Sequence, residues 1–156
     1  MTIAVFDVDG VVADVRHRLH HIQGRRKDWD AFFAAASDDR PLQRGLDLVA
    51  ELGENHDIVW LTGRPAWLRR ETAAWLADNS LPADELHMRP GGDFRPARRF
   101  KLEVLLRLAP RDIAAFVDDD IEVIDAAQEA GLPAIFADWL PRDRALRDAQ
   151  DRLGRA

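Results

Sequence analysis

The sequence predicts an α/β fold in which a mostly parallel β-sheet carries helices on both faces. Two observations lead to this prediction: short apolar runs rich in branched residues alternate with amphipathic helical patterns, and acidic or hydroxyl residues follow several of the apolar runs. A chain of 156 residues, of which 47% are hydrophobic, is long enough for one domain with a buried core. We therefore expect residues 1–156 to form a single domain.

The apolar runs have the length of buried parallel strands, and strands are expected over Ile3–Val8, Asp57–Thr62, Ile113–Val117 and Ala134–Phe136. Leu86–Met88 is a further, shorter candidate. Helices are expected between them, over Pro41–Leu52, Pro65–Asn79, Phe100–Leu108 and Ile121–Ala130. Helices of this length between strands require right-handed crossovers, which predicts a three-layer, Rossmann-like arrangement.

One segment interrupts this alternation of strands and helices. Residues 14–39 contain a basic, histidine-containing stretch and then the short amphipathic pattern Asp28–Phe33. Because this insertion follows the first strand directly, it is expected to lie over the carboxyl edge of the sheet, where open α/β folds bind their ligands. We therefore expect a small lid.

Composition excludes several classes of protein. The chain has no cysteine, which removes disulfides, thiol catalysis and thiolate zinc sites. A formal net charge of −6 argues against a nucleic-acid-binding protein that is basic as a whole. No apolar run approaches the ~20 residues of a membrane span, and the first strand begins too early to leave room for a signal peptide. We expect a cytoplasmic protein with no membrane partner.

The sharpest chemical signal is the pair Asp7 and Asp9 at the end of the first predicted strand. Residues two apart in an extended segment point the same way, so both carboxylates can face one ligand. Gly10 then allows the backbone to turn closely around that ligand. The alternatives are aspartates that only cap a turn, or a calcium loop, whose later ligand positions are not filled here.

Two further strands also end in residues that can do chemistry. The second ends in Thr62, followed by Gly63 and Arg64, and a later one ends in Asp118 and Asp119. Lys101 lies at the start of the helix before that later strand and can neutralise phosphate charge. Carboxylates of this kind suit Mg²⁺, beside which a carboxylate can attack phosphorus and form an aspartyl-phosphate. Each residue alone could be a cap or a surface charge, but their coincidence at equivalent edges favours a site.

In these residues the chain resembles the haloacid dehalogenase-like phosphohydrolase superfamily. The four motifs of that superfamily stand in the expected order, at Asp7 and Asp9, Thr62, Lys101, and Asp118 with Asp119. The resemblance implies that Asp7 is the nucleophile and Asp9 the general acid and base. It also implies that Thr62 hydrogen-bonds the transferred phosphoryl group, while Lys101 holds Asp7 and the phosphate.

The same resemblance implies a Mg²⁺ cofactor. Its ligands would be the carboxylate of Asp7, the backbone carbonyl of Asp9 and the carboxylate of Asp118, with Asp119 close behind. One position departs from the common pattern, since Val11 stands where the superfamily most often has Thr. Val also occurs there among its phosphatases, so we expect an active enzyme.

A narrower likeness is to the 3′-phosphatase domain of phage-type polynucleotide kinases and its stand-alone relatives. It rests on Arg18, nine residues past Asp9, and on the stretches Lys27–Phe33, Leu61–Arg64 and Met88–Pro96. The likeness implies that Arg18 and Arg64 contact substrate phosphate, with Gly63 in the same motif. The position four residues before the motif lysine, usually Asp, is Ala97 here, and the chain has no phosphate-binding loop of a kinase.

Local charge also favours an anionic substrate. Residues 16–27 hold five Arg or Lys and no acid, and residues 89–101 hold five more, which makes Arg89 and Arg95 candidate substrate-binding residues. Trp29 or Phe94 could stack on a terminal base, although Trp29 is also suited to packing inside the lid. The alternating charges of residues 142–155 predict an exposed helix face.

Together these observations predict a Mg²⁺-dependent phosphomonoesterase that works through an aspartyl-phosphate and removes 3′-phosphates from DNA or RNA ends. A separate kinase or ligase is a candidate partner. Two alternatives remain: a nucleotide or small-metabolite phosphatase with the same chemistry, and a non-catalytic phosphate-binding or regulatory module. A receiver domain is disfavoured because its phospho-acceptor lies between the acidic pair and the Thr, where this chain has no Asp.

Overall fold

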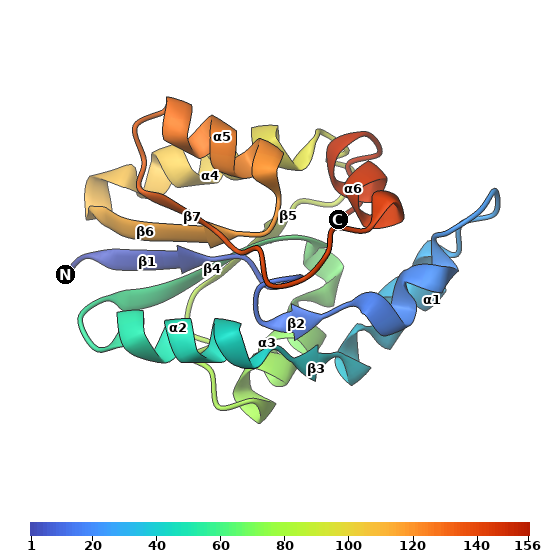
Figure 1. The fold of residues 1–156 in the computed structure, drawn as a ribbon, viewed down its shortest axis with the longest axis horizontal. Coiled ribbons are helices and arrows are strands. Elements are labelled where there is room, and N and C mark those ends of the chain that lie inside the picture. The colour runs from blue at the N-terminus through green and yellow to red at the C-terminus, as the bar shows by residue number, and fades with distance from the viewer.

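The structure, a computed structural model, describes residues 1–156 and contains a five-stranded parallel sheet (Figure 1). The strands are ordered β5-β4-β1-β6-β7, so the first strand lies at the centre. Their bounds are Ile3–Phe6 (β1), Asp57–Pro65 (β4), Leu86–Arg89 (β5), Ile113–Asp118 (β6) and Ala134–Phe136 (β7). All five predicted strands are present, and the predicted α/β fold class is confirmed.

Helices cover both faces of this sheet (Figure 1). One face carries α2 (Gln43–Gly53) and α3 (Arg69–Asp78), the latter preceded by a 3-10 turn over Ala66–Leu68. The other face carries α4 (Ala97–Leu108), which continues into a 3-10 turn over Ala109–Arg111, and α5 (Ile121–Glu129). Helix α4 begins three residues earlier than the sequence predicts, because the extended Pro96 sets the position at which it starts.

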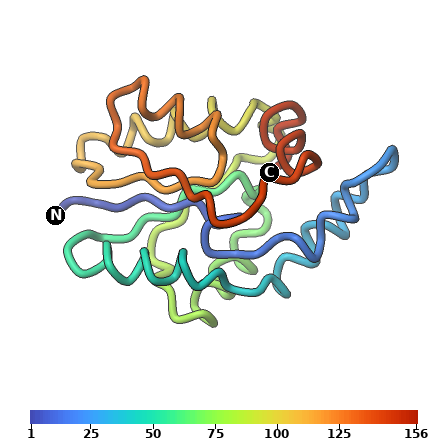
Figure 2. The backbone as a smooth tube through the Cα atoms, in the orientation of Figure 1, coloured from blue at the N-terminus to red at the C-terminus, as the bar shows by residue number.

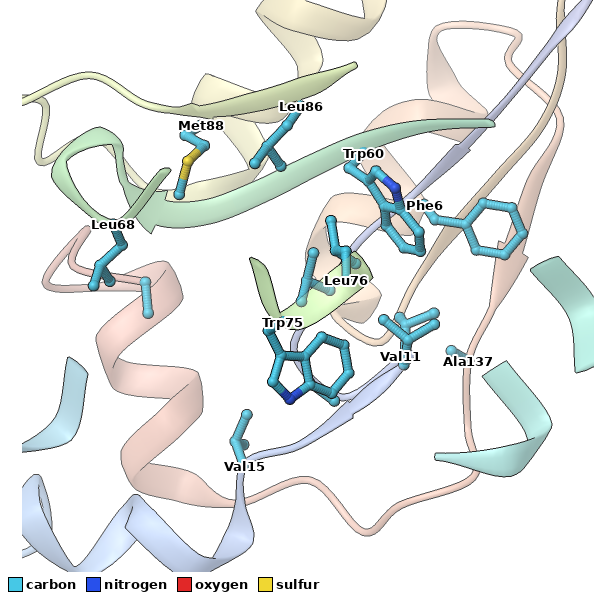
Figure 3. Close-up of a cluster of buried hydrophobic side chains, with 14 of the residues drawn as sticks. Phe6, Val11, Val15, Trp60, Leu68, Trp75, Leu76, Leu86, Met88 and Ala137 are labelled. Carbon is cyan, nitrogen blue, oxygen red and sulfur yellow. The ribbon is translucent and has the colours of Figure 1, made fainter. Parts of the chain in front are cut away.

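The core is divided between the two faces of the sheet. Alternate strand residues point to opposite faces, so Phe6 and Trp60 pack toward α2 and α3, whereas Val5 and Phe116 pack toward α4 and α5. Figure 3 shows the first cluster, in which Trp60 lies beside Phe6 and above Leu76. Burying each such side chain stabilises the fold by roughly 1.5–3 kcal/mol, which fixes the strand ends that carry the polar residues.

The insertion after β1 forms an arm beside the carboxyl ends of the strands (Figures 1 and 2). A two-stranded antiparallel ribbon of β2 (Ala13–Asp14) and β3 (Arg40–Pro41) closes its base. Between these strands lie a 3-10 helix over Arg16–His21, helix α1 (Trp29–Ala34) and a 3-10 turn over Ala35–Asp38. Asp28 caps α1 by accepting a hydrogen bond from the backbone of Ala31 at 3.0 Å.

The C-terminal segment forms helix α6 (Arg144–Asp151), in which Arg144 and Arg147 are exposed as the alternating charges predict, but the helix also has a buried face. Leu146, Ala149 and Gln150 are buried. Residues three and four apart share a helix face, so the few uncharged positions of this run form a packing stripe that the alternating charges conceal. None of the helices in the protein is long and apolar enough to cross a membrane.

Candidate active site

A tight turn after β1 positions the first pair of aspartates. The carbonyl of Val8 accepts hydrogen bonds from the backbone N–H groups of Val12 and Ala13, both at 3.0 Å. Gly10 has a φ of +77°, and a Cβ at this position would overlap the side chain of Asp119. Only glycine meets both demands, and the turn therefore brings the β1 loop against the end of β6.

Asp7, Asp118 and Asp119 form a compact acidic group at the carboxyl edge of the sheet. Each offers a carboxylate oxygen, and these oxygens lie within 4.8 Å of one another. Lys101, from the first turns of α4, donates to Asp118 Oδ2 at 2.7 Å, and its Nζ lies 3.0 Å from Asp7 Oδ1. Asp7 Oδ2 and Asp119 Oδ1 are buried with no hydrogen-bond partner. Two orphaned carboxylate oxygens beside a single lysine suit a hard divalent cation.

Burial and mutual repulsion change the acidity of this group. Burial, with the neighbouring Asp118, raises the pKa of Asp7 to about 8 despite the attraction of Lys101. Burial and the charge of Asp7 raise the pKa of Asp119 well above its ordinary value. The two acids raise the pKa of Lys101 against its own burial, so the lysine stays charged. A divalent cation would reverse the shifts of the carboxylates.

Asp9 lies in a different electrostatic environment. Arg64 binds it through Nη2 at 2.7 Å and Nε at 3.1 Å, and Arg18 Nη2 donates to it at 3.0 Å. Burial alone would raise the pKa of Asp9, but Arg64 and then Arg18 outweigh burial and lower it to about 2. The pKa of Asp7 is thus raised and that of Asp9 lowered, although the two aspartates are only two residues apart.

Asp39, at the end of the insertion, is a site residue that the sequence did not reveal. It is buried, and it accepts hydrogen bonds from Arg18 Nε at 2.8 Å and Arg64 Nη2 at 3.0 Å, with His17 Nε2 2.7 Å away. The indole of Trp75 donates to its backbone carbonyl at 2.9 Å. Asp39 therefore orients both arginines that bind Asp9. No motif marks it; its one sequence signal is that buried arginines require an acidic partner.

Thr62 and Gly63 lie beside this cluster on β4. The pairing of Phe6 with Trp60 sets Thr62 next to the turn that follows β1. Thr62 is fully buried, and its hydroxyl accepts a hydrogen bond from the backbone N–H of Arg64 at 3.2 Å. A Cβ at Gly63 would overlap the backbone of Ala156. The C-terminal segment thus covers the strand end that carries Thr62.

The two arginines predicted near residues 89–101 differ in their surroundings. Arg89 is buried and donates to the backbone carbonyls of Gly63 at 3.1 Å, Arg95 at 2.7 Å and Ala156 at 3.1 Å. Burial lowers its pKa to about 10. Arg95 pairs instead with Asp93 at 2.8 Å and with Glu103 at 2.6 Å. Arg89 is thus tied to the end of β4 at Gly63, whereas the charge of Arg95 is already matched by two acids.

The fold and the acidic edge define the class of the protein, a phosphatase domain of the haloacid dehalogenase-like kind. Solved structures with this fold include the class C acid phosphatase from Bacillus anthracis, with a TM-score of 0.64 and 16% identity over 86% of this chain and 65% of that chain. Residues 1–137 match the family described as the polynucleotide kinase PNKP phosphatase domain. The chain belongs to that family.

Two further comparisons are with longer proteins. A chain in the structure of the Pnkp1/Rnl/Hen1 complex is similar with a TM-score of 0.71 and 21% identity, over 86% of this chain and 45% of that chain. The protein named "Putative nucleotidase OB0422" from Oceanobacillus iheyensis is 27% identical over 122 residues, which are 77% of this chain and 61% of that protein. The chain thus spans less than two thirds of each.

Proposed function

We propose that the protein is a Mg²⁺-dependent phosphomonoesterase that removes a 3′-phosphate from the end of a DNA or RNA strand, through an aspartyl-phosphate on Asp7. The observation that carries this proposal is the Asp7 carboxylate. One of its oxygens lies 3.0 Å from Lys101 Nζ, and the other is buried without a partner at the carboxyl edge of the sheet. Membership in the phosphatase family supports the same reading.

The residues present fit a magnesium ion. Three carboxylates converge within 4.8 Å, two of their oxygens lack partners, and one lysine cannot neutralise all three charges. Asp7, Asp118, Asp119 and the backbone carbonyl of Asp9 would hold the ion. When bound, Mg²⁺ screens the repulsion between the nucleophilic carboxylate and the phosphate dianion.

The residues of the chain divide the reaction between them. An oxygen of Asp7 attacks phosphorus, the bond from phosphorus to the substrate 3′-oxygen breaks, and Asp9 gives that oxygen a proton. Water then attacks the aspartyl-phosphate while Asp9 takes its proton, which releases inorganic phosphate and restores Asp7. Thr62 and Lys101 hold the transferred phosphoryl oxygens.

The hydrogen bonds of Arg18 and Arg64 to Asp9 account for how Asp9 can act first as an acid and then as a base. With its pKa held at about 2, Asp9 is ionised and suited to accept the proton of water. To act as an acid it must lose the influence of Arg18 and Arg64. We propose that a bound phosphate dianion draws their hydrogen bonds away from Asp9, which raises the pKa of Asp9 for the first step.

The preference for a nucleic-acid end rests on the arm. The loop between the 3-10 helix over Arg16–His21 and α1 carries the exposed residues Arg25 and Arg26. The arm that holds this loop lies on the same side of the molecule as the carboxyl ends of the strands (Figure 2). Such charges attract a phosphodiester backbone. A separate kinase or ligase is a proposed partner, since a similar chain belongs to the Pnkp1/Rnl/Hen1 RNA repair complex.

The test is phosphate release, with Mg²⁺, from a 3′-phosphorylated oligonucleotide, a 5′-phosphorylated oligonucleotide and a 3′-mononucleotide, by the wild type and by Asp7→Asn. We expect the 3′-phosphorylated oligonucleotide to be hydrolysed fastest of the three, and a loss of at least about 10³-fold in the variant because the nucleophile is gone. Faster turnover of the mononucleotide would favour the second candidate, a nucleotide phosphatase, which the name of the Oceanobacillus relative suggests. Release unaffected by Asp7→Asn would overturn the mechanism.

A further inference from the structure

An aromatic pocket lies beside the candidate active site. Its walls include Trp29 and Phe33 from α1, Trp67 from the 3-10 turn after β4, and Phe94 from the loop after β5, around a volume of about 190 Å³. Trp67 is 60% exposed and Phe94 54% exposed, which is unusual for rings of this size. Aromatic faces open to water and gathered from three separate elements indicate a binding surface.

The buried ring of Phe33 supports the rings of Trp29 and Trp67. Phe33 is buried; its ring stacks on that of Trp29 with centroids 6.2 Å apart and meets that of Trp67 edge-on at 5.6 Å. Packing inside the arm therefore accounts for Phe33 and for one side of each tryptophan. It does not account for the exposed side of Trp67 or for Phe94.

A planar cation, the guanidinium of Arg155, lies over two of these rings. Its central carbon is 4.5 Å from the centroid of the Phe94 ring and 5.5 Å from that of Trp29. The guanidinium forms no ion pair and donates no hydrogen bond within the protein. Stacking alone therefore holds it, and such contacts contribute only about 0.5–1 kcal/mol at exposed sites. A stronger stacking ligand could displace it.

The pocket borders the carboxyl end of β4, the strand that carries Thr62. Pro65 and Trp67 line it three and five residues after Thr62. Arg89 also lines it and donates to the carbonyl of Gly63 at 3.1 Å. The rings therefore lie on the side of the molecule where the proposed function places the substrate phosphate.

We propose that this pocket binds the nucleobase of the terminal nucleotide, and that Arg155 occupies it when no base is present. The inference rests on the proposed function and extends it to the part of the substrate that the protein recognises. A nucleobase is flat and stacks on aromatic rings whatever its identity, and Arg26 and Lys27 lie close by for the adjoining phosphates. The pocket would therefore favour nucleotides over other phosphate esters without reading their sequence.

The first test compares Trp67→Ala and Phe94→Ala with the wild type on three substrates. These are a 3′-phosphorylated oligonucleotide, the same oligonucleotide with an abasic terminal nucleotide, and glycerol 2-phosphate. We expect KM for the first to rise about tenfold, as loss of one stacking contact predicts, with KM for the other two unchanged. Leu106→Ala, which removes another exposed apolar side chain (53% exposed) on α4, is the matched control.

The second test examines the exchange with Arg155. Arg155→Ala removes the competing guanidinium, so KM for the base-bearing oligonucleotide should fall severalfold while KM for the abasic one stays the same. Arg152→Ala is the control, because this exposed side chain contacts only Asp148, at 3.4 Å. A rise in KM with Arg155→Ala would show that the arginine supports the rings, and the proposed exchange would then be wrong.

A binding measurement separates this inference from the proposed function. Tryptophan fluorescence of Asp7→Asn, titrated with the base-bearing and the abasic oligonucleotide, reports binding without turnover. Equal affinities would overturn the base pocket even where the wild type hydrolyses both substrates. Tighter binding of the base-bearing strand, lost in Phe94→Ala, would support the pocket even if the wild type released no phosphate and the proposed reaction failed.

Discussion

The two aspartates of the β1 loop belong to two differently built halves of one site. Asp7 is held among groups that the sheet itself delivers: β1, β6 and the start of α4 bring it to Asp118 and Lys101. Asp9 is held by Arg18 and Arg64, and Asp39 orients both arginines. Of these three residues, Arg18 and Asp39 belong to the insertion. In the proposed mechanism, the chemistry that every substrate needs thus rests on the sheet, and the group proposed to transfer protons is coupled to the insertion.

The largest effect is expected from the sheet-based half. Lys101→Met leaves the buried carboxylates of Asp7 and Asp118 without the lysine that neutralises them. In metal-free buffer above pH 8, where Asp7 is ionised, we expect this to cost about 3–5 kcal/mol of the free energy of unfolding. Urea denaturation measures it. Lys27→Met, in which the lost amine donates only to backbone carbonyls of the arm, is the control. A change below about 1 kcal/mol would show that the carboxylates are neutral in the folded protein and need no lysine.

Removal of Mg²⁺ is a second test of the half of the site that contains Asp7. The pKa of Asp7 is raised to about 8 in the fold, so its stabilising contribution is full below about pH 4 and is lost as the pH rises toward 8. In EDTA the Tm should therefore fall between pH 5 and pH 8. A fixed Mg²⁺ concentration, 100 times the Kd at pH 8, should restore about 2.7 kcal/mol at pH 8. The same concentration should raise Tm less at pH 6, because protons there compete with the ion for the Asp7 carboxylate. An equal rise at both values would contradict the assigned site.

Asp39→Asn tests the half that depends on the insertion. Both arginines keep Asp9 but lose the carboxylate that orients them, and we expect kcat to fall about tenfold, with a changed pH profile and little change in KM for glycerol 2-phosphate. Asp38→Asn changes an exposed neighbour that has no ion pair and serves as the control. An unchanged pH profile would mean that Asp39 supports the fold and not the position of the arginines.

The smallest effect is expected outside both halves. Arg95 pairs with Asp93 and Glu103 in a partly exposed cluster, and exposed ion pairs of this kind contribute about 1 kcal/mol or less. Arg95→Ala should therefore leave kcat and KM for 3′-phosphorylated ends within about twofold of the wild type. A larger loss in the phosphatase assay would restore Arg95 to the substrate-binding set that the sequence predicts.

The sequence predicts the sheet-based half well because its signals are local. Asp7 and Asp118 each follow an apolar run, and strand ends of a parallel sheet meet at one edge whatever the rest of the chain does. Asp39 and the packing of α6 carry no such signal. Asp39 matters only because folding brings it to Arg64, 25 positions away. The buried face of α6 is marked only by a few uncharged residues, such as Ala149 and Gln150, within a run of charges.

The two-stranded ribbon at the base of the arm has a consequence for how this protein could diversify. Pairing of Ala13 with Pro41 brings both ends of the intervening loop together before the loop begins. Lengthening such a loop therefore adds little closure entropy, about 0.6 kcal/mol for each doubling. The segment between β2 and β3 can therefore be exchanged for another of different length or sequence. The new segment must retain an arginine that reaches Asp9 and an aspartate that reaches Arg64. Recognition can then change while the hydrolytic machinery stays as it is.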